Sequence, residues 1–447
     1  MKVAVKKFKS GERYAFLLGE DGVPDFWVTH FVTQKLRMTK AATSIEQYLK
    51  NIKHLKRWEE INGRDLLDEI YSGKVPDRDD IKKIKEHCSY QAKAVKDVSA
   101  SNVVDMGKFH LSKTTDKPTI GKTQYISRIA HIAEFLHFIG KERVKQKPRA
   151  AELFDELDEM KTQLKKGKPK GKSKKVSLDK SGIADDVFED FVEVAKPDSH
   201  YNPFKNPVVK FRNYLIVQVL YETGFRCAEL LALRISDIGT DTDNPTLSVI
   251  RRHDSKDDPR LKEPTAKTLG RPVSITKELR DLLNTYIKIH RSDTKVAKTH
   301  PFIFVSHKDK EGHYQSGQPL IQQTINDIFN SIKGVNPERF WAISPHSYRH
   351  YFNDQLSDQI DEEKRAVRQE VKRLEQVGLH QAAKQYADEN KITEQRELEI
   401  RAELNGHSSL KSGETYLKRT TRKQAQKIRQ KMQAKMKAKL EGHNHGG

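Results

Sequence analysis

Residues 223–231 read Thr-Gly-Phe-Arg-Cys-Ala-Glu-Leu-Leu, and they decide the fold of the second half of the chain. The stretch before them, residues 211–222, is almost entirely apolar, which predicts a buried helix that ends before Gly224. Arg226 and Glu229 stand one turn apart on the helix expected next, so both project from one face. Alone, this pair would be a surface salt bridge. Its place after a Thr-Gly turn, where a helix start exposes N–H groups, favours a bound phosphate.

Around this stretch the sequence predicts helices and a little strand. Residues 246–250 and 271–275 alternate between apolar and polar side chains, the pattern of half-buried strands, and they bracket a lysine-rich loop. Residues 302–305 form a short apolar run, and 320–332 have the periodicity of a helix. We therefore expect a mainly α fold with a small antiparallel β-sheet.

Two further motifs follow. Residues 344–349 read Ser-Pro-His-Ser-Tyr-Arg, in which the proline suits a helix start and places His346 and Arg349 on one face. A lone histidine and arginine at this spacing is common and weakly informative. Residues 404–409 read Leu-Asn-Gly-His-Ser-Ser, and Tyr416 follows. A tyrosine on a helix is usually a half-buried packing residue, so only the accompanying motifs distinguish it.

The three motifs, their order and the interval from His407 to Tyr416 resemble those of the tyrosine recombinase, or phage integrase, family. The resemblance covers roughly residues 26–420. It implies a two-domain C-shaped clamp around duplex DNA, made of a helical core-binding domain and a mainly helical catalytic domain. It also implies a site-specific DNA recombinase or integrase that cleaves and rejoins DNA through a 3′-phosphotyrosine, for integration or excision of a mobile element. The covalent bond retains the phosphodiester energy, so no metal, ATP or other cofactor is expected.

The resemblance also assigns roles to individual residues. Arginine guanidinium groups hold the scissile phosphate through paired hydrogen bonds. A free phenol has a pKa of about 10, so attack near neutral pH requires neighbouring cations that favour the phenolate. The implied catalytic set is Arg226, Lys267, His346, Arg349, His407 and Tyr416, with Tyr416 as nucleophile and Glu229 supporting the geometry.

The general acid is expected on the loop between the two strands. Family members carry a lysine there, often as Lys-Thr shortly before a strand, and Lys267-Thr268 fits that context. A lysine can give up its proton to the departing 5′-oxygen, whereas an arginine cannot. Lys256 and Lys262 lie in the same loop and remain alternatives.

The chain divides into an expected series of segments. A lysine-rich run at 165–175 contains glycine and proline but no apolar residue that could dock it, which predicts an extended linker rather than a nuclear localisation signal. The expected order is an N-terminal extension (1–25) with strands, a helical core-binding, SAM-like DNA-binding domain (26–145), a basic linker (146–177), a catalytic domain (178–420) and a basic C-terminal tail (421–447).

Helix signals support the first domain. Ser44 and Gln47 form an expected capping box, followed by apolar residues at helical spacing. A second helix is expected near residues 122–139, with Gly140 as its C-cap. The polar faces of these helices carry many lysines, which favours a DNA-facing surface over an ordinary solvated one.

Two segments depart from the family pattern. The interval from Arg349 to His407 is unusually long, and its excess, residues 359–399, is densely charged. A short apolar stripe predicts a helical hairpin or short coiled coil there, formed by Val367, Val371, Leu374 and Val377. The basic tail carries an apolar stripe of its own, a candidate interface with a neighbouring protomer, formed by Ile428, Met432, Met436 and Leu440.

Composition agrees with a nucleic-acid partner. The chain has 447 residues, enough for two domains, and its 83 Lys and Arg against 62 Asp and Glu give a net charge of +21, which suits a polyanion. Its two cysteines indicate neither a disulfide scaffold nor a zinc site. No apolar stretch could span a bilayer, so we expect a cytoplasmic, nucleoid-associated protein without a membrane partner.

The expected partners are double-stranded DNA with specific recombination sites, further copies of the chain in a homotetramer on DNA, and accessory DNA-bending or directionality proteins. Two other functions remain open. A type IB topoisomerase-like enzyme would use the same residues to nick and close DNA as a monomer. A non-catalytic DNA-binding protein would explain the charge but not the catalytic set.

Overall fold

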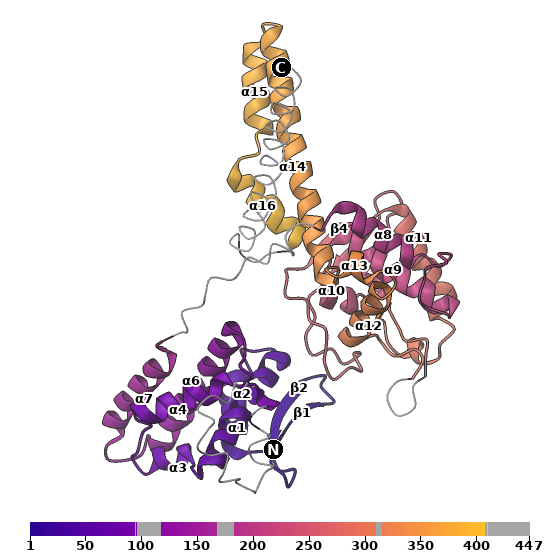
Figure 1. Ribbon diagram of the computed structural model, residues 1–447. Helices are drawn as coiled ribbons and strands as arrows, with labels where there is room; N and C mark the ends of the chain where they lie inside the picture. The colour runs from indigo at the N-terminus through magenta and orange to yellow at the C-terminus, as the bar shows by residue number, and fades with distance from the viewer. Residues whose placement is uncertain (94, 96–117, 168–182, 310–314, 407–408, 410–447) are drawn as a thin grey trace, which may run out of the picture. The chain divides into compact units, whose positions relative to one another are not determined.

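The computed structural model describes residues 1–93, 95, 118–167, 183–309, 315–406 and 409. The chain divides into two compact units, Met1–Val176 and Ser177–Gly447, each described here by itself (Figure 1). Within the described residues both units are dominated by helices, and each contains one antiparallel pair of strands. The expected mainly α fold with small antiparallel sheets is confirmed.

The first unit is a helical bundle joined to a β-hairpin. Strands β1 and β2 pair antiparallel, with Val3 opposite Leu17 and Val5 opposite Ala15. The strands are β1 (Lys2–Lys7) and β2 (Arg13–Leu18). The helices of the described residues are α1 (Phe26–Phe31), the π-helical η1 (Val32–Leu36), α2 (Ala42–Asn62), α3 (Leu66–Tyr71), α4 (Arg78–Ser89), α6 (Lys122–Val144) and α7 (Ala150–Lys165).

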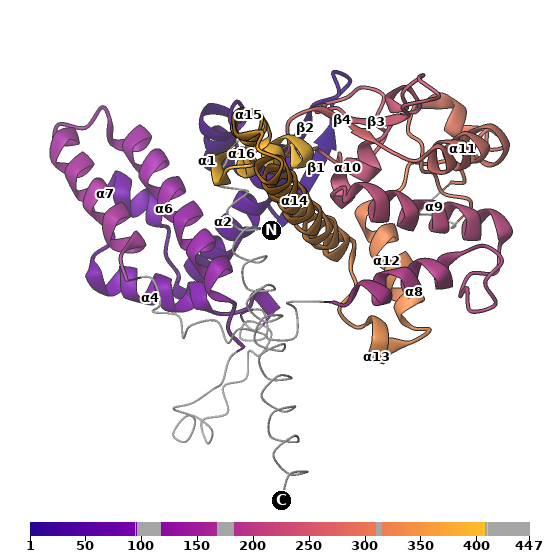
Figure 2. The ribbon, with the colours of Figure 1, turned by 90° about the horizontal axis from the view of Figure 1, so that it is seen from above.

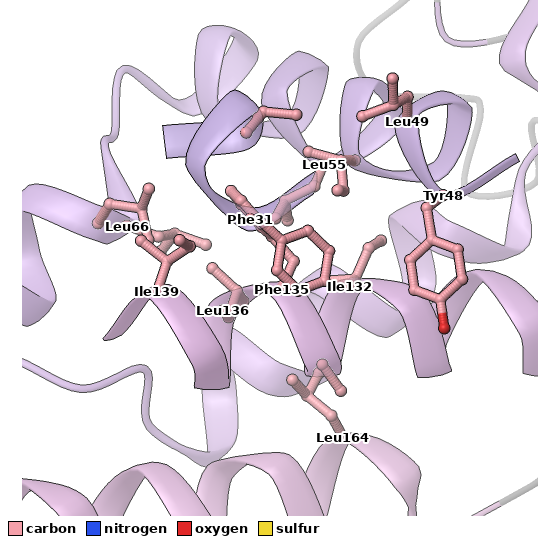
Figure 3. Packing of buried hydrophobic residues seen from close by; sticks show 14 of the residues in the cluster. Phe31, Tyr48, Leu49, Leu55, Leu66, Ile132, Phe135, Leu136, Ile139 and Leu164 are labelled. Atoms are coloured by element: carbon pink, nitrogen blue, oxygen red, sulfur yellow. The ribbon is translucent and has the colours of Figure 1, made fainter. Parts of the chain in front are cut away.

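The core of the first unit forms where α1, α2, α3, α6 and α7 meet. Figure 3 shows Phe31 beside Phe135, with ring centroids 5.5 Å apart and edge-to-face geometry. Leu55 and Ile132 lie in the same cluster, and Leu164 reaches it from α7. Strand β2 contributes to this core as well, through three buried residues, Tyr14, Ala15 and Leu17. Residues 1–25 are therefore part of the first unit rather than an extension from it.

The linker predicted for residues 146–177 is wrong over its first part, because residues 150–165 form α7. Leu153, Leu157 and Met160 recur at helical spacing and are buried in the core of the first unit. The aspartates and glutamates between them give the segment the composition of solvated chain. Helix α6 likewise continues through Gly140, where an added Cβ would lie 2.9 Å from a Leu157 methyl. This glycine permits close packing of α6 and α7 and does not cap a helix.

The expected capping box of α2 is also wrong. The helix begins at Ala42 after Ala41, whose side chain cannot cap it, so Ser44 lies inside the first turn. The apolar residues that predicted this helix, including Ile45, Leu49 and Ile52, are buried as expected.

The second unit packs further helices around a two-stranded sheet. Its elements are α8 (Asp185–Ala195), α9 (Pro207–Thr223), α10 (Cys227–Ala232), η4 (Ile235–Asp237), β3 (Thr246–Val249), β4 (Arg271–Ser274), α11 (Lys277–Thr285), η5 (Tyr286–Arg291), η6 (Val296–Thr299), α12 (Gln322–Lys333), α13 (Pro337–Phe340), α14 (Pro345–Gln376), α15 (His380–Asn390) and α16 (Glu394–Asn405). Strands β3 and β4 pair antiparallel, as predicted, with Leu247 opposite Val273.

Buried arginines hold the irregular parts of the second unit. Arg291 donates hydrogen bonds to the carbonyl oxygens of Phe302, Ala297 and His300, at 2.6–2.8 Å. Arg260 pairs with Asp258 and donates to two further carbonyls. Loop carbonyls have no ladder partner, and a buried carbonyl without a hydrogen bond is costly. The arginine forks satisfy these carbonyls, so several basic residues of this unit are structural.

The charged insertion predicted at residues 359–399 is helical. Helix α14 runs unbroken from Pro345 to Gln376, and α15 packs back along its second half (Figures 1 and 2). Gly378 makes the turn with φ 78°. Helix α16 then leads back to the body of the second unit, where its end contacts β4. Across the described ranges, no helix is long and apolar enough to cross a membrane.

Candidate active site

Gly224 brings the first motif against α14. It ends α9 in the left-handed region, with φ 58°, and an added Cβ would lie 2.5 Å from the Cβ of Phe352. Any other residue would be strained in its backbone and would push α14 away. The sequence Thr-Gly therefore fixes both the end of α9 and the approach of the helix that carries the second motif.

Arg226 precedes α10 instead of lying on it. Its backbone is extended, with ψ 150°, and it is the N-cap residue of the helix. Glu229 Oε2 accepts a hydrogen bond from the Arg226 backbone N at 3.0 Å, and Arg226 Nη1 donates to Glu229 Oε1 at 3.2 Å. The prediction that both side chains share a helical face is wrong, and capping joins them instead. The Arg226 side chain remains 29% exposed, so a ligand can reach it.

Glu229 is a buried carboxylate that connects two motifs. Its side chain is fully buried, and Oε1 also accepts a hydrogen bond from Thr268 Oγ1 at 2.7 Å. Arg271 Nη2 lies 3.6 Å from Oε2. Burial raises the pKa of this carboxyl, but the charge of Arg271 and the hydrogen bonds from Thr268 and Arg226 outweigh it, so the pKa is lowered overall. Glu229 stays ionised and holds Arg226 beside the loop that contains Thr268.

Arg349 is completely buried in the first half of α14. Its Nη1 donates to the carbonyl oxygen of Gly224 at 3.1 Å, and its Nη2 donates to that of Asn405 at 2.8 Å. One guanidinium group therefore joins the backbone of the first motif to the residue that ends α16. In this structure Arg349 ties three segments together that are far apart in the sequence.

His346 lies at the exposed start of α14. Ser344 caps this helix, its Oγ accepting a hydrogen bond from the Ser347 backbone N, and Pro345 occupies the first turn as predicted. The His346 ring packs edge-to-face on His350, with centroids 4.6 Å apart. The imidazole is therefore at the surface, one turn before the buried Arg349.

The loop that carries Lys267 is held against the end of α16 by two hydrogen bonds. Lys267 is exposed between the buried Ala266 and Thr268. The backbone N of Leu269 donates to the carbonyl oxygen of Gly406 at 2.9 Å. Arg271 Nε donates to the Leu404 carbonyl at 2.9 Å.

Gly406 makes that contact possible. It ends α16 with φ 63°, and an added Cβ would lie 2.9 Å from the carbonyl oxygen of Leu269. The residue after Gly406 in the chain is His407. His407 and Tyr416 both lie outside the described residues, as do the tail 421–447 and most of the lysine-rich run at 165–175.

The alternative lysines, Lys256 and Lys262, precede Lys267 in the same loop, and both are exposed. Glu263 is next to Lys262 in the sequence and accepts hydrogen bonds from the backbone N of Asp254 and of Ser255, at 2.7 and 3.0 Å. Of the three candidate lysines, Lys267 is the one whose immediate neighbour Thr268 bonds to the carboxylate that holds Arg226.

Comparison with known proteins identifies this arrangement. Residues 198–362 match the model of the phage integrase family. The second unit carries a phage integrase family domain. The match includes Arg226, Lys267, His346 and Arg349 and ends before His407.

Curated relatives include transposase A from transposon Tn554 of Staphylococcus aureus, 31% identical over 146 residues. The alignment covers 32% of this chain and 36% of the relative, so the chain spans about a third of the length of the curated relatives it matches. Solved structures that are similar include XerH site-specific recombinase bound to a palindromic difH substrate, with 14% identity and a TM-score of 0.41 over 90% of this chain and 94% of that one. XerA recombinase has 16% identity and a TM-score of 0.31 over 88% and 93%.

Sequence reasoning missed several residues that connect the motifs of the integrase domain. Thr268 and Arg271 were noticed only as the context of Lys267, although both contact Glu229. Asn353 and Asn405 were not singled out at all. Asn405 stands in the third motif, which was a signal available in the sequence, whereas Asn353 lies in the middle of a helix and has none. Across the parts of the chain that the structure describes, no group of His, Cys, Asp and Glu is disposed as metal ligands.

Proposed function

We propose that this protein is a site-specific DNA recombinase or integrase that cleaves and rejoins duplex DNA through a 3′-phosphotyrosine intermediate at Tyr416. The single observation that carries the proposal is the set of contacts that gathers the motifs of the integrase domain. Glu229 joins Arg226 to Thr268, Arg349 joins Gly224 to Asn405, and Leu269 is bonded to Gly406.

Each residue of the set has a chemical task in this proposal. The partly exposed guanidinium group of Arg226 holds a non-bridging oxygen of the scissile phosphate. Arg349 is buried and donates to the Gly224 and Asn405 carbonyl oxygens, so it joins the phosphate only when bound DNA replaces one of these acceptors. The Tyr416 phenol transfers its proton to His346 as its oxygen attacks phosphorus, the bond to the 5′-oxygen breaks, and Lys267 supplies the proton to that oxygen. His407 donates a hydrogen bond as charge accumulates on the phosphate. A 5′-hydroxyl of a partner strand reverses the step, so the sequence of reactions requires neither ATP nor a metal.

The net charge supports a DNA substrate. The chain has 83 basic and 62 acidic residues, and this excess of positive charge suits a polyanion. In the proposal, the first unit and the integrase domain both bind the duplex. Strand exchange between two duplexes requires four protomers, so a homotetramer is part of the proposal. The name of the Tn554 relative supports a role in moving a mobile element.

A nicked suicide substrate tests the proposal, because loss of the short 5′ fragment traps a covalent intermediate. The protein should form a covalent adduct with DNA, and Tyr416→Phe should form none while it binds DNA with unchanged affinity. Tyr386→Phe, on α15, is the matched control and should form the adduct at the parental rate. Adduct formation by Tyr416→Phe would refute the nucleophile. Relaxation of supercoiled DNA without any paired-duplex complex would instead indicate a topoisomerase.

A further inference from the structure

Two asparagines form a closed pair between α14 and α16. Asn353 Nδ2 donates to Asn405 Oδ1 at 3.1 Å, and Asn405 Nδ2 donates to Asn353 Oδ1 at 2.9 Å. Their exposed fractions are 1% and 0%. The second hydrogen of each amide is used as well, since Asn353 donates to the Arg349 carbonyl and Asn405 to the Arg401 carbonyl. Every amide hydrogen of the pair is therefore satisfied.

Such a pair is sensitive to position. Each amide is donor and acceptor to the other, so a shift or rotation of one helix breaks both bonds and leaves buried polar atoms without partners. An apolar contact of similar size would tolerate such sliding. The pair thus sets the register of α16 on α14 more tightly than hydrophobic packing would.

An ion network supports the pair from behind. Arg401 is fully buried and donates to Glu397 Oε1 at 2.8 Å and to Ser357 Oγ at 2.7 Å. Ser357 Oγ donates in turn to the carbonyl oxygen of Asn353 at 2.7 Å. Lys364 Nζ donates to Glu397 Oε2 at 2.6 Å. These contacts bind the start of the α14–α15 hairpin to α16.

The end of α16 transmits this register to the active site. Immediately after Asn405, the Gly406 carbonyl oxygen accepts the hydrogen bond from the Leu269 backbone N, next to Thr268 and Lys267. The Asn405 carbonyl oxygen accepts from Arg349. A change in the position of α16 therefore alters the backbone that leads to His407 and the loop that carries Lys267.

We propose that Asn353 and Asn405 are positioning residues of the strand-cleavage reaction: their amide pair sets where α16 delivers the third motif against Arg349 and the Lys267 loop. This proposal rests on the proposed function. The proposal also gives the long insertion a role, because the ion network of Arg401, Glu397 and Lys364 at its base helps to hold α16 in the same position. Neither asparagine touches DNA in this account, so neither is a catalytic residue.

The test replaces both amides by leucine, Asn353→Leu with Asn405→Leu. Removing both partners avoids an unpaired buried amide, so the folded state keeps a similar stability while it loses the directional contact. The carbonyl oxygens of Arg349 and Arg401 lose an amide donor in this variant. Both lie within helices, where backbone N–H groups are their ordinary partners. The matched control is Gln369→Leu with Gln381→Leu, which makes the same two changes on the exposed surface of the hairpin.

Four quantities are measured on the full chain: the midpoint of thermal unfolding, the hydrogen-exchange rate of the Leu269 amide, the rate of adduct formation on the nicked substrate, and the affinity for DNA. For the double leucine variant we expect a midpoint near that of the parent, Leu269 exchange at least tenfold faster, and cleavage at least tenfold slower at unchanged affinity. The control should match the parent in all four.

Two results in a stably folded double variant would each overturn the proposal. One is a Leu269 amide exchange rate equal to that of the parent, and the other is a DNA cleavage rate within twofold of the parent. Faster Leu269 exchange in a protein whose parent forms no adduct on DNA would refute the proposed function and leave the positioning geometry supported. Should the double variant fail to fold, Ser357→Ala provides the same test, because it removes the hydroxyl between Arg401 and the Asn353 carbonyl with little change of volume. We then expect Leu269 exchange and cleavage to change at least threefold in the same directions, and no change in either overturns the proposal.

Discussion

Helix α14 has two halves that differ in almost everything except their secondary structure. From Pro345 to Ile360 the helix buries eight residues, Ser347, Tyr348, Arg349, Tyr351, Asn353, Asp354, Ser357 and Ile360. From Asp361 to Gln376 it buries none, and its charges pair locally, as Arg373 does with Glu370. The first half contacts the integrase domain, whereas the second half contacts α15.

The difference shows that a segment can be helical without being held in a fixed position on the domain. Exposed pairs one turn apart, such as Arg365 with Glu362, stabilise a helix by only about 0.2–0.5 kcal/mol each. They hold the second half as a helix but do not fix its position. The second half contacts α15, and its Lys364 forms an ion pair with Glu397 on α16. The first half carries buried polar groups with specific partners, which are costly to break and therefore specify a geometry. Substitutions should thus have large effects in the network of the first half and small effects beyond it.

The largest expected loss of stability comes from Arg401→Met. The variant leaves the buried Glu397 carboxylate with its ion pair to Lys364 and removes the hydrogen bond from Arg401 to Ser357 Oγ. Breaking a buried ion pair costs about 3–5 kcal/mol, and the surviving lysine contact places this case near about 3 kcal/mol. Urea denaturation measures the free energy of unfolding. Arg396→Met, at an exposed ion pair of the same helix, should change it by less than about 0.5 kcal/mol; equal losses would show that burial does not decide the effect.

The loss of stability at acidic pH should also differ between the buried network around Glu397 and the exposed half of α14. Burial raises the pKa of Glu397, but hydrogen bonds from Lys364 and Arg401 outweigh it and lower the pKa overall from its usual 4.5. A lowered folded-state pKa contributes stability that is present above the unfolded-state pKa and is lost as pH falls through the folded-state value. Stability should therefore fall below about pH 4.5, and Glu397→Gln should flatten that fall.

Glu370 is the control for this acid effect. Its pKa is also lowered, by the hydrogen bond from Arg373, but the pair is exposed on the hairpin. Because solvent screens this pair, Glu370→Gln should change the pH dependence of unfolding much less than Glu397→Gln does. If both variants flatten the curve equally, exposed pairs contribute as much as the buried network, contrary to the comparison.

A smaller effect is expected for Thr268→Val, which keeps the shape of the side chain and removes the hydrogen bond to Glu229. Hydrogen bonds to charged groups contribute about 1.5–3 kcal/mol, so a loss near about 2 kcal/mol is expected, together with slower DNA cleavage. Thr265→Val, whose hydroxyl makes only a 3.5 Å contact with the Glu263 carbonyl, should lose less than about 0.5 kcal/mol. Equal effects of the two valines in denaturation and cleavage assays would contradict the role of Thr268.

The smallest loss of stability is expected from a deletion that removes most of the α14–α15 hairpin. Replacing residues 366–391 by a short Gly-Ser linker removes α15 and the exposed half of α14 but keeps the contact between Lys364 and Glu397. Ala383 is the one buried residue among those removed, so stability should change by less than about 1 kcal/mol, with Leu269 exchange unchanged. A larger loss would show that the hairpin supports the integrase domain itself.

Some elements were predictable from residue patterns alone. The apolar stretch before Gly224, the alternation of β3 and β4 and the proline at the start of α14 each matched the structure, because local side-chain patterns reflect burial at helix or strand spacing. Helix α7 was missed because its charged residues outnumber the apolar residues that face the core. Arg226 was placed on a helix although its backbone is extended, since spacing alone does not distinguish a cap from the first turn.

The sequence by itself determined which chemical groups are available: two arginines, a lysine, histidines and a tyrosine in motifs that resemble those of the phage integrase family. Only the tertiary structure decided how these motifs are joined. Its ties run largely to backbone carbonyl oxygens, those of Gly224, Leu404, Asn405 and Gly406, or between Asn353 and an asparagine far along the chain. Every residue has a carbonyl oxygen, so residue identity does not indicate which one will accept a hydrogen bond. That choice is made only when distant segments pack together and bring particular acceptors within reach of each buried donor.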